Sequence, residues 1–150
     1  MSIRGAAFIA GIHEHPGRDL PHHTIWDIHT EVALGALADA GLSMGDVDAL
    51  FCDGTAGFGV LTLCDHLGIR PRYVDSTETG GSSYLAHVGH AAAAIAAGKC
   101  QVALITLAAK GISSLQMWSS KSAAMSCTAA VSSFIPVNSA MRSPLKSWLK

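Results

Sequence analysis

A turn between an extended segment and an Ala-rich segment holds the residues best suited to do chemistry. It contains Glu78, Ser82 and Ser83 around the adjacent glycines Gly80 and Gly81. Two glycines allow a sharp strand-to-helix turn, and we expect Ser82 or Ser83 to cap the first turn of the helix. Because a helix N-terminus carries partial positive charge, the turn suits a nucleophile, an oxyanion or a bound acyl group.

The residue types in this turn leave its chemistry open. The two serines are more typical of helix caps than of nucleophiles, because the hydrolase motif G-x-S-x-G would need a glycine where this chain has Tyr84. Glu78 has three interpretations: a catalytic acid or base, a solvated turn residue, or a group that satisfies helix N–H donors across a dimer interface.

Histidines form two groups along the chain. His87 and His90 are three residues apart on one helix face, a spacing that metal sites use, but no third ligand is apparent. We therefore expect interior or interface histidines there. The second group crowds a loop rich in Gly and Pro: His13, His15, His22 and His23. Nothing in the sequence determines the geometry of this group, so we expect a solvated loop and no metal site.

The cysteines and one glycine-rich loop give weaker signals. Cys52, Cys64, Cys100 and Cys127 lack C-x-x-C spacing, which favours a reducing, cytoplasmic compartment. Cys52, Cys64 and Cys100 sit in or beside apolar segments, so we expect them to be small core residues. Residues 57–62 partly match the dinucleotide fingerprint G-x-G-x-x-G, with Thr62 in place of the third glycine. A small NAD-binding protein therefore remains a minor alternative.

Strand-like and helix-like segments alternate through the first 110 residues. We expect strands over 4–10, 47–52, 71–75 and 101–107, and helices over 24–40, 60–67 and 82–97. Gly11 is expected to end the first strand, Thr24 and Asp27 to form a capping box, and Gly41 to end the following helix in a left-handed conformation. This βαβαβαβ order predicts an α/β fold with a mostly parallel sheet and helices on both faces. Active sites of such folds lie at the carboxyl ends of the strands, where the turn containing Glu78 also lies.

Composition limits the possible partners. The chain has 150 residues, of which 49% are hydrophobic and 14% charged, more apolar than a free-standing domain of this size needs. This excess predicts surface for a partner subunit or a missing second half. The net charge of −1 argues against nucleic-acid binding. We find neither an apolar run long enough to span a membrane nor a signal-peptide pattern.

Residues 111–150 differ abruptly from the rest. They contain no acidic residue and 11 serines. We therefore expect two regions, a half-domain over 1–110 and an atypical Ser-rich tail over 111–150. The simple interpretation of the tail is a disordered basic segment, and the sharper one is a shifted reading frame near Lys110.

Residues 3–108 resemble the N-terminal part of thiolase-superfamily proteins, especially the lipid-transfer or sterol-carrier thiolase-like branch (acetyl-CoA acetyltransferase-like). The segments behind the resemblance are 6–12, 38–42, 46–51, 75–83 and 91–99. Thiolases place their nucleophilic cysteine three residues before a Gly-Ser pair, and on that register Glu78 stands in its place before Gly81 and Ser82. None of the four cysteines replaces that nucleophile by position.

The resemblance implies a transferase or lyase activity on CoA thioesters, in lipid metabolism or steroid degradation. Coenzyme A would be part of the substrate, with no covalently bound cofactor. The missing cysteine favours retro-aldol carbon–carbon cleavage over acyl transfer, with Glu78 and Ser82 as the candidate catalytic residues. The resemblance also implies a homodimer, an OB-fold partner protein, and a truncated chain that is inactive by itself. The alternative is a non-catalytic thiolase-like module that docks an OB-fold partner.

Overall fold

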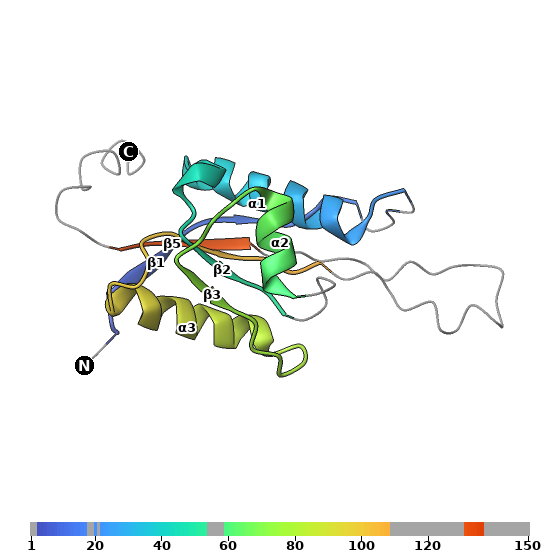
Figure 1. Ribbon diagram of the computed structural model, residues 1–150. Helices are drawn as coiled ribbons and strands as arrows, with labels where there is room; N and C mark the ends of the chain where they lie inside the picture. The colour runs from blue at the N-terminus through green and yellow to red at the C-terminus, as the bar shows by residue number, and fades with distance from the viewer. Residues whose placement is uncertain (1–2, 18–19, 21, 54–58, 109–130, 137–150) are drawn as a thin grey trace.

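The computed structural model describes residues 3–17, 20, 22–53, 59–108 and 131–136 of the chain. In this part of the chain, one β-sheet lies between two layers of helix (Figure 1). In chain order the elements are β1 (Ala7–His13), α1 (Ile25–Ala40), the short 3-10 helix η1 (Met44–Asp46), β2 (Ala49–Phe51), α2 (Val60–Leu67), β3 (Tyr73–Asp75), α3 (Ser83–Ala96), β4 (Ala103–Ile105) and β5 (Val131–Pro136).

Three neighbouring strands of the sheet, β3, β2 and β4, pair in parallel, as predicted. The strand order of the sheet is β1-β5-β4-β2-β3, and β2 pairs in parallel with both β3 and β4. Strand β5 runs antiparallel to β1 and to β4, so β1 points the same way as β4. The alternation of strands and helices up to β4 is confirmed, although β2, β3 and β4 are each shorter than the apolar runs that contain them.

Strand β5 is an addition to the predicted elements. The sequence of residues 131–136 shows no sustained alternation of polar and apolar residues, so no strand was expected there. The backbone nevertheless pairs with β1 on one side and β4 on the other. The remainder of the segment 109–150 lies outside the described residues, and its interpretation as a disordered or frame-shifted tail stays a prediction.

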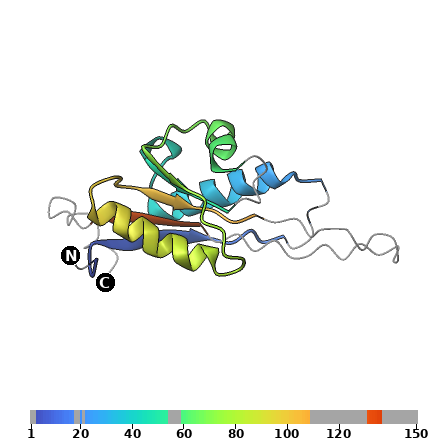
Figure 2. The same ribbon diagram turned by 60° about the horizontal axis from the view of Figure 1, so that its bottom comes forward.

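Helices cover both faces of the sheet. Helices α1 and α2 lie on one face and α3 on the other (Figure 1 and Figure 2). Strand β2 shows why: Leu50 packs in the cluster with α1 and α2, whereas Ala49 and Phe51 pack in the cluster with α3. All three side chains are buried, as expected for a strand covered on both sides. None of the helices in the described ranges is long and apolar enough to cross a membrane.

The residues predicted to begin and end α1 are confirmed. The backbone N–H of Thr24 donates to Asp27 Oδ2 over 2.7 Å, and the Asp27 N–H donates back to Thr24 Oγ1 over 3.2 Å. This capping box satisfies two donors at the start of α1. Gly41 follows the helix with φ of 67°, a left-handed conformation that favours glycine.

The prediction that Gly11 ends the first strand is wrong. Strand β1 continues through Gly11 to His13. A Cβ atom on Gly11 would lie 2.4 Å from the carbonyl oxygen of Ala36 and 2.7 Å from the amide nitrogen of Ala40. The glycine is therefore needed because α1 crosses β1 at this point, and it does not act as a strand terminator. Gly35 makes the reciprocal approach, since a Cβ there would lie 2.4 Å from the His13 ring.

A buried histidine joins α1 to the sheet. His29 has no exposed surface, and its Nδ1 atom is hydrogen-bonded to Thr106 Oγ1 just beyond β4. Burial lowers the pKa of His29 to about 4; the charge of Asp53 opposes this shift and that of His66 adds to it. The imidazole is therefore neutral in the folded protein at pH 7.

We expect Gly11→Ala to destabilise the fold by about 1–3 kcal/mol, the typical cost of overpacking a tight contact. The control is Gly89→Ala in α3, where an added Cβ meets no atom within 4 Å. Replacing a helical glycine by alanine is expected to stabilise by up to about 1 kcal/mol. Urea unfolding of the two variants measures the difference, and equal midpoints would contradict the close-approach role of Gly11.

The folded protein is also expected to lose stability on acidification between about pH 6.5 and pH 4. The folded pKa of His29 lies below the ordinary histidine value of 6.5, so the unfolded chain binds the proton first. The contribution of neutral His29 to the free energy of unfolding is thus complete above pH 6.5. It falls by up to about 1.4 kcal/mol per pH unit below pH 6.5. Urea unfolding at several pH values measures this dependence of the free energy of unfolding on pH. His29→Gln should lose the dependence, and His90→Gln, an exposed control, should keep it. An unchanged dependence in His29→Gln would refute the assignment.

Candidate functional site

The turn from β3 to α3 is held by the hydroxyl groups of two serines. Ser83 Oγ accepts a hydrogen bond from the Thr79 N–H over 2.8 Å and donates to the Gly80 carbonyl over 2.7 Å. Ser82 Oγ donates to the Thr79 carbonyl over 3.1 Å. Ser82 is the N-cap residue of α3 but makes no side-chain capping bond. The expectation that either serine caps the helix is therefore corrected: both hydroxyls bind back into the turn and stabilise it.

Glu78 and Ser82 both lie on the surface of this turn. Each is exposed, and within the described ranges Glu78 makes no hydrogen bond or ion pair. Gly80, with φ of 72°, provides the left-handed residue that the turn requires. A ligand can therefore reach the carboxylate and the hydroxyl from solvent, and the catalytic role of each stays a prediction.

Polar groups are buried directly behind the turn, on the α3 face of the sheet. Asp53 follows β2 and is 8% exposed; its Oδ2 accepts a hydrogen bond of 2.5 Å from the Tyr84 hydroxyl. His87 is fully buried and its Nε2 donates to the Thr77 carbonyl over 2.9 Å. The rings of Tyr84 and His87 pack edge to face with centroids 5.7 Å apart.

The same edge carries buried polar groups on the α1 face. Asp53 raises the pKa of His29 against the larger effect of burial, so its charge acts on that face too. Thr106, the partner of His29, donates its N–H to the Phe51 carbonyl over 3.0 Å. We call Asp53, Tyr84, His87, His29 and Thr106 the carboxyl-edge cluster, because they lie at the carboxyl ends of β2, β3 and β4.

The carboxyl-edge cluster places two buried imidazoles and one nearly buried carboxylate at this edge. Two ring nitrogens, His29 Nε2 and His87 Nδ1, are buried without a hydrogen-bond partner among the described residues. The sequence patterns predicted a site at this edge but identified none of Asp53, Tyr84, His29 and Thr106 as site residues. The available signal was position alone, since Asp53 directly follows one predicted strand and Thr106 lies near the end of another.

The two histidines of α3 do not share a ligand. His87 binds the Thr77 carbonyl, whereas the exposed His90 has its Nδ1 2.7 Å from Asp75 Oδ2. Burial raises the pKa of Asp75, but hydrogen bonds from Thr77 and His90 outweigh it and hold the pKa below its ordinary value. His90 therefore belongs to a surface pair, and His87 to the interior.

The cysteines described by the structure are core residues. Cys52, Cys64 and Cys100 are buried and unpaired. Burial raises the pKa of Cys52 to about 12 and that of Cys100 to about 11, so both are neutral thiols at pH 7. Cys127 lies outside the described residues, and so does Gly57, the first glycine of the partial dinucleotide fingerprint. No cysteine lies in the turn around Glu78.

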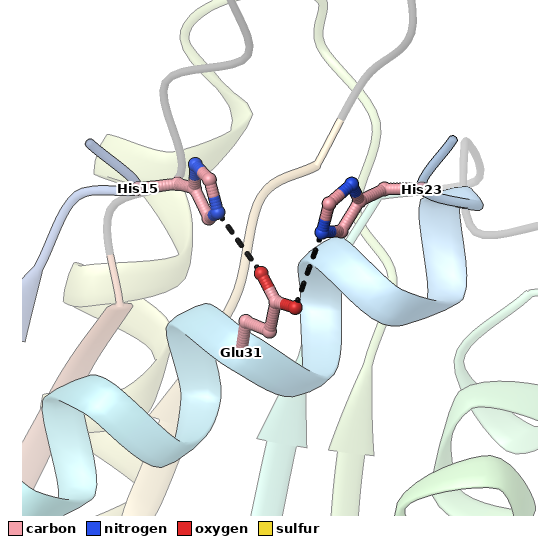
Figure 3. Close-up of side chains that lie close together, drawn as sticks. All are labelled: His15, His23 and Glu31. Carbon is pink, nitrogen blue, oxygen red and sulfur yellow. Dashed lines mark hydrogen bonds and ion pairs between the residues drawn. The ribbon is translucent and has the colours of Figure 1, made fainter. Parts of the chain in front are cut away.

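Two histidines of the loop before α1 make contacts that the sequence did not predict. His15 and His23 both point at the carboxylate of Glu31 on α1 (Figure 3). His15 Nε2 lies 2.9 Å from Glu31 Oε2, and His23 Nε2 lies 3.4 Å from Glu31 Oε1. The expected solvated loop is thus corrected for His15, whose side chain is 12% exposed.

Comparison with protein-family models gives no match, and neither does comparison with curated proteins. Solved structures do match. A structure named the Ltp2-ChsH2(DUF35) aldolase is 29% identical, with a TM-score of 0.64 over 70% of this chain and 28% of that chain. A monomeric SCP2-thiolase like protein type 1 from Mycobacterium smegmatis is 20% identical, with a TM-score of 0.59 over 74% of this chain and 25% of that chain.

OleA from Xanthomonas campestris is a third similar protein. Its structure with bound lauric acid and lauroyl-CoA is 16% identical, with a TM-score of 0.60 over 74% of this chain and 40% of that chain. A variant of it bound to cerulenin is 14% identical, with a TM-score of 0.70 over 87% of this chain and 56% of that chain. At such identities the likeness shows the fold alone.

This chain spans about a quarter of the length of the aldolase and the SCP2-thiolase like protein. This chain contains three parallel strands, the helices that flank them and the turn with Glu78. The chain therefore has the α/β fold of the N-terminal half of thiolase-like proteins.

Proposed function

We propose that this chain is the N-terminal half of a thiolase-superfamily enzyme that acts on CoA thioesters. The parent reaction that we favour is retro-aldol cleavage of a lipid or steroid acyl-CoA in the cytoplasm. The observation behind this choice is Glu78, an exposed carboxylate in the turn before α3; by the resemblance, thiolases carry their nucleophilic cysteine at this position. The 29% identity to an aldolase supports the same choice.

The chemistry of the described thiols argues against the thiolase route. Acyl transfer through a thioester needs a thiolate in contact with the substrate. Burial raises the pKa of Cys52, Cys64 and Cys100, and each of the three is buried away from solvent. A carboxylate cannot form the thioester, so a different use of the turn is needed.

Retro-aldol cleavage needs an acid or base in this turn and no thiol nucleophile. A base removes the proton of the β-hydroxyl group, its oxygen forms a carbonyl, and the bond between the α and β carbons breaks. The electron pair of that bond forms an enolate of the CoA thioester, which then takes up a proton. We assign Glu78 as an acid or base in these proton transfers and Ser82 as a hydrogen-bonding group beside it.

The chain alone is proposed to be inactive. It spans 28% of the length of the aldolase that it resembles. By the resemblance, a second half supplies the catalytic histidine and the acid/base cysteine or tyrosines. With Glu78 and Ser82 alone, the chain lacks the second acid or base that the proton transfers of the cleavage need.

A non-catalytic assembly module is the second candidate. Strand β3 is at the edge of the sheet, and large apolar side chains are exposed nearby and elsewhere, including Leu85 at 79% and Ile12 at 64%. Such surface suits a second subunit or an OB-fold partner, and the name of the similar aldolase includes a DUF35 component. A stoichiometric complex with a DUF35 protein, independent of substrate, would favour this candidate.

We expect the purified 150-residue chain to release no free CoA thiol and no cleavage product from β-hydroxyacyl-CoA or acyl-CoA substrates. A steady-state assay with a thiol reagent and product chromatography measures this, with an intact thiolase-like enzyme as the positive control. Turnover that Glu78→Gln abolishes would show that the chain is complete as an enzyme and would overturn the fragment proposal.

The fragment proposal also predicts a second open frame in the gene. We expect the DNA after codon 110, translated in the other two frames, to continue into alternating strand and helix patterns with a histidine or tyrosines suited to acid/base catalysis. Resequencing through that codon checks the result. Early stop codons in both other frames would instead favour the assembly module.

A further inference from the structure

We propose that His15, His23 and Glu31 form a binding site for a divalent transition-metal ion, with Zn²⁺ as the expected occupant. Their ligand atoms all lie within 4.8 Å of one another. Two imidazoles and one carboxylate are a ligand set that zinc uses when a fourth position is left open. This site is separate from the turn at Glu78 and does not depend on the proposed function.

The fold brings these residues together from three segments. His15 lies two residues beyond β1, His23 directly precedes the capping residue Thr24, and Glu31 projects from α1 (Figure 3). The capping box determines where α1 begins, so it also determines where His23 stands relative to Glu31. The contact of α1 with β1 brings His15 to the same place.

The ring of His15 is oriented by the loop that follows it. The Gly17 N–H donates to His15 Nδ1 over 2.9 Å, and the Gly17 carbonyl lies 3.1 Å from the same atom. A Cβ on Gly17 would lie 3.1 Å from the His15 ring and 2.9 Å from Leu20, so the loop packs closely against the imidazole.

Gly17 can hydrogen-bond either neutral tautomer of the His15 ring, including the one that a metal ligand needs. Without an ion, Nδ1 accepts from the Gly17 N–H, and Nε2 carries the proton that it donates to Glu31. When an ion binds at Nε2, the ring changes tautomer: Nε2 releases its proton, Nδ1 takes one up from solvent, and the resulting Nδ1–H can donate to the Gly17 carbonyl. A ligating histidine commonly donates its second ring N–H to a backbone carbonyl in this way.

The dimensions of the cluster fit a zinc ion after small movements. Zinc–nitrogen and zinc–oxygen bonds of about 2.0–2.2 Å place tetrahedral ligand atoms about 3.3–3.6 Å apart. The Glu31 carboxylate lies between the two rings, 2.9 Å from His15 Nε2 and 3.4 Å from His23 Nε2. Partial exposure of the three side chains, at 12%, 36% and 45%, gives an ion access from solvent.

The proposed site adjoins a pocket. His23 and Glu31 line a cavity of about 400 Å³, and its other lining residues are His22, Asp27, Thr30 and His66. His66 is held in this wall by a 3.1 Å contact between its Nε2 and Thr30 Oγ1 and by packing on Trp26. A water molecule or a small anionic ligand could therefore complete the coordination from the pocket side.

The test is calorimetric titration of the metal-free, tag-free 150-residue chain with ZnCl₂. We expect one tight site per chain, and at least about tenfold weaker binding in His15→Asn, His23→Asn and Glu31→Gln, since each removes one ligand or its charge. The matched control is His90→Asn, an exposed histidine in α3 that pairs with Asp75 and should leave zinc binding unchanged.

Two further measurements keep the proposal falsifiable. Circular dichroism of each variant identifies any loss of folding, and Glu31→Gln, the most exposed ligand, is the variant expected to fold normally. Titration with Co²⁺ should give the visible absorption of a tetrahedral site, and Glu31→Gln should lose it. Zinc binding that His90→Asn weakens as much as His15→Asn, or binding at several equivalent weak sites, would overturn the proposal.

Discussion

The close contact between α1 and β1 determines where the functional side chains of α1 lie. Two glycines make that contact possible, because Gly11 and Gly35 leave no Cβ between the helix and the strand. Once α1 lies at that distance, His29 reaches Thr106 at the end of β4, and Glu31 reaches the loop that follows β1. A helix held farther out would separate all of these pairs.

The carboxyl edge of the sheet combines exposed and buried polar groups at short range. Glu78 and Ser82 face solvent, whereas His87 is fully buried and Asp53 is nearly so. An electrostatic interaction in such a poorly solvated layer is stronger than the same interaction in water. The hydrogen bond from Tyr84 to Asp53 therefore orients a carboxylate whose charge acts on both faces of the sheet, as the pKa of His29 shows.

Sequence patterns predicted the features that depend on neighbouring residues. The capping box of Thr24 and Asp27, the left-handed Gly41 and the order of strands and helices each follow from a few adjacent positions. The features that were missed depend on residues far apart in the chain. Gly11 resembles a strand end until α1 is placed over it, and Glu31 resembles an ordinary surface residue until His15 and His23 are placed beside it.

Strand β5 has a consequence for how the chain folds. In the described structure β1, the first strand, has β5 as its only strand partner, and residue 7 pairs with residue 136. Chains dominated by such distant pairings fold slowly, because a long loop must close before any contact forms. During synthesis the backbone edges of β1 and β4 therefore remain open until residues 131–136 leave the ribosome. Any protein that contains this half must supply an antiparallel strand at that position or expose two edges prone to aggregation.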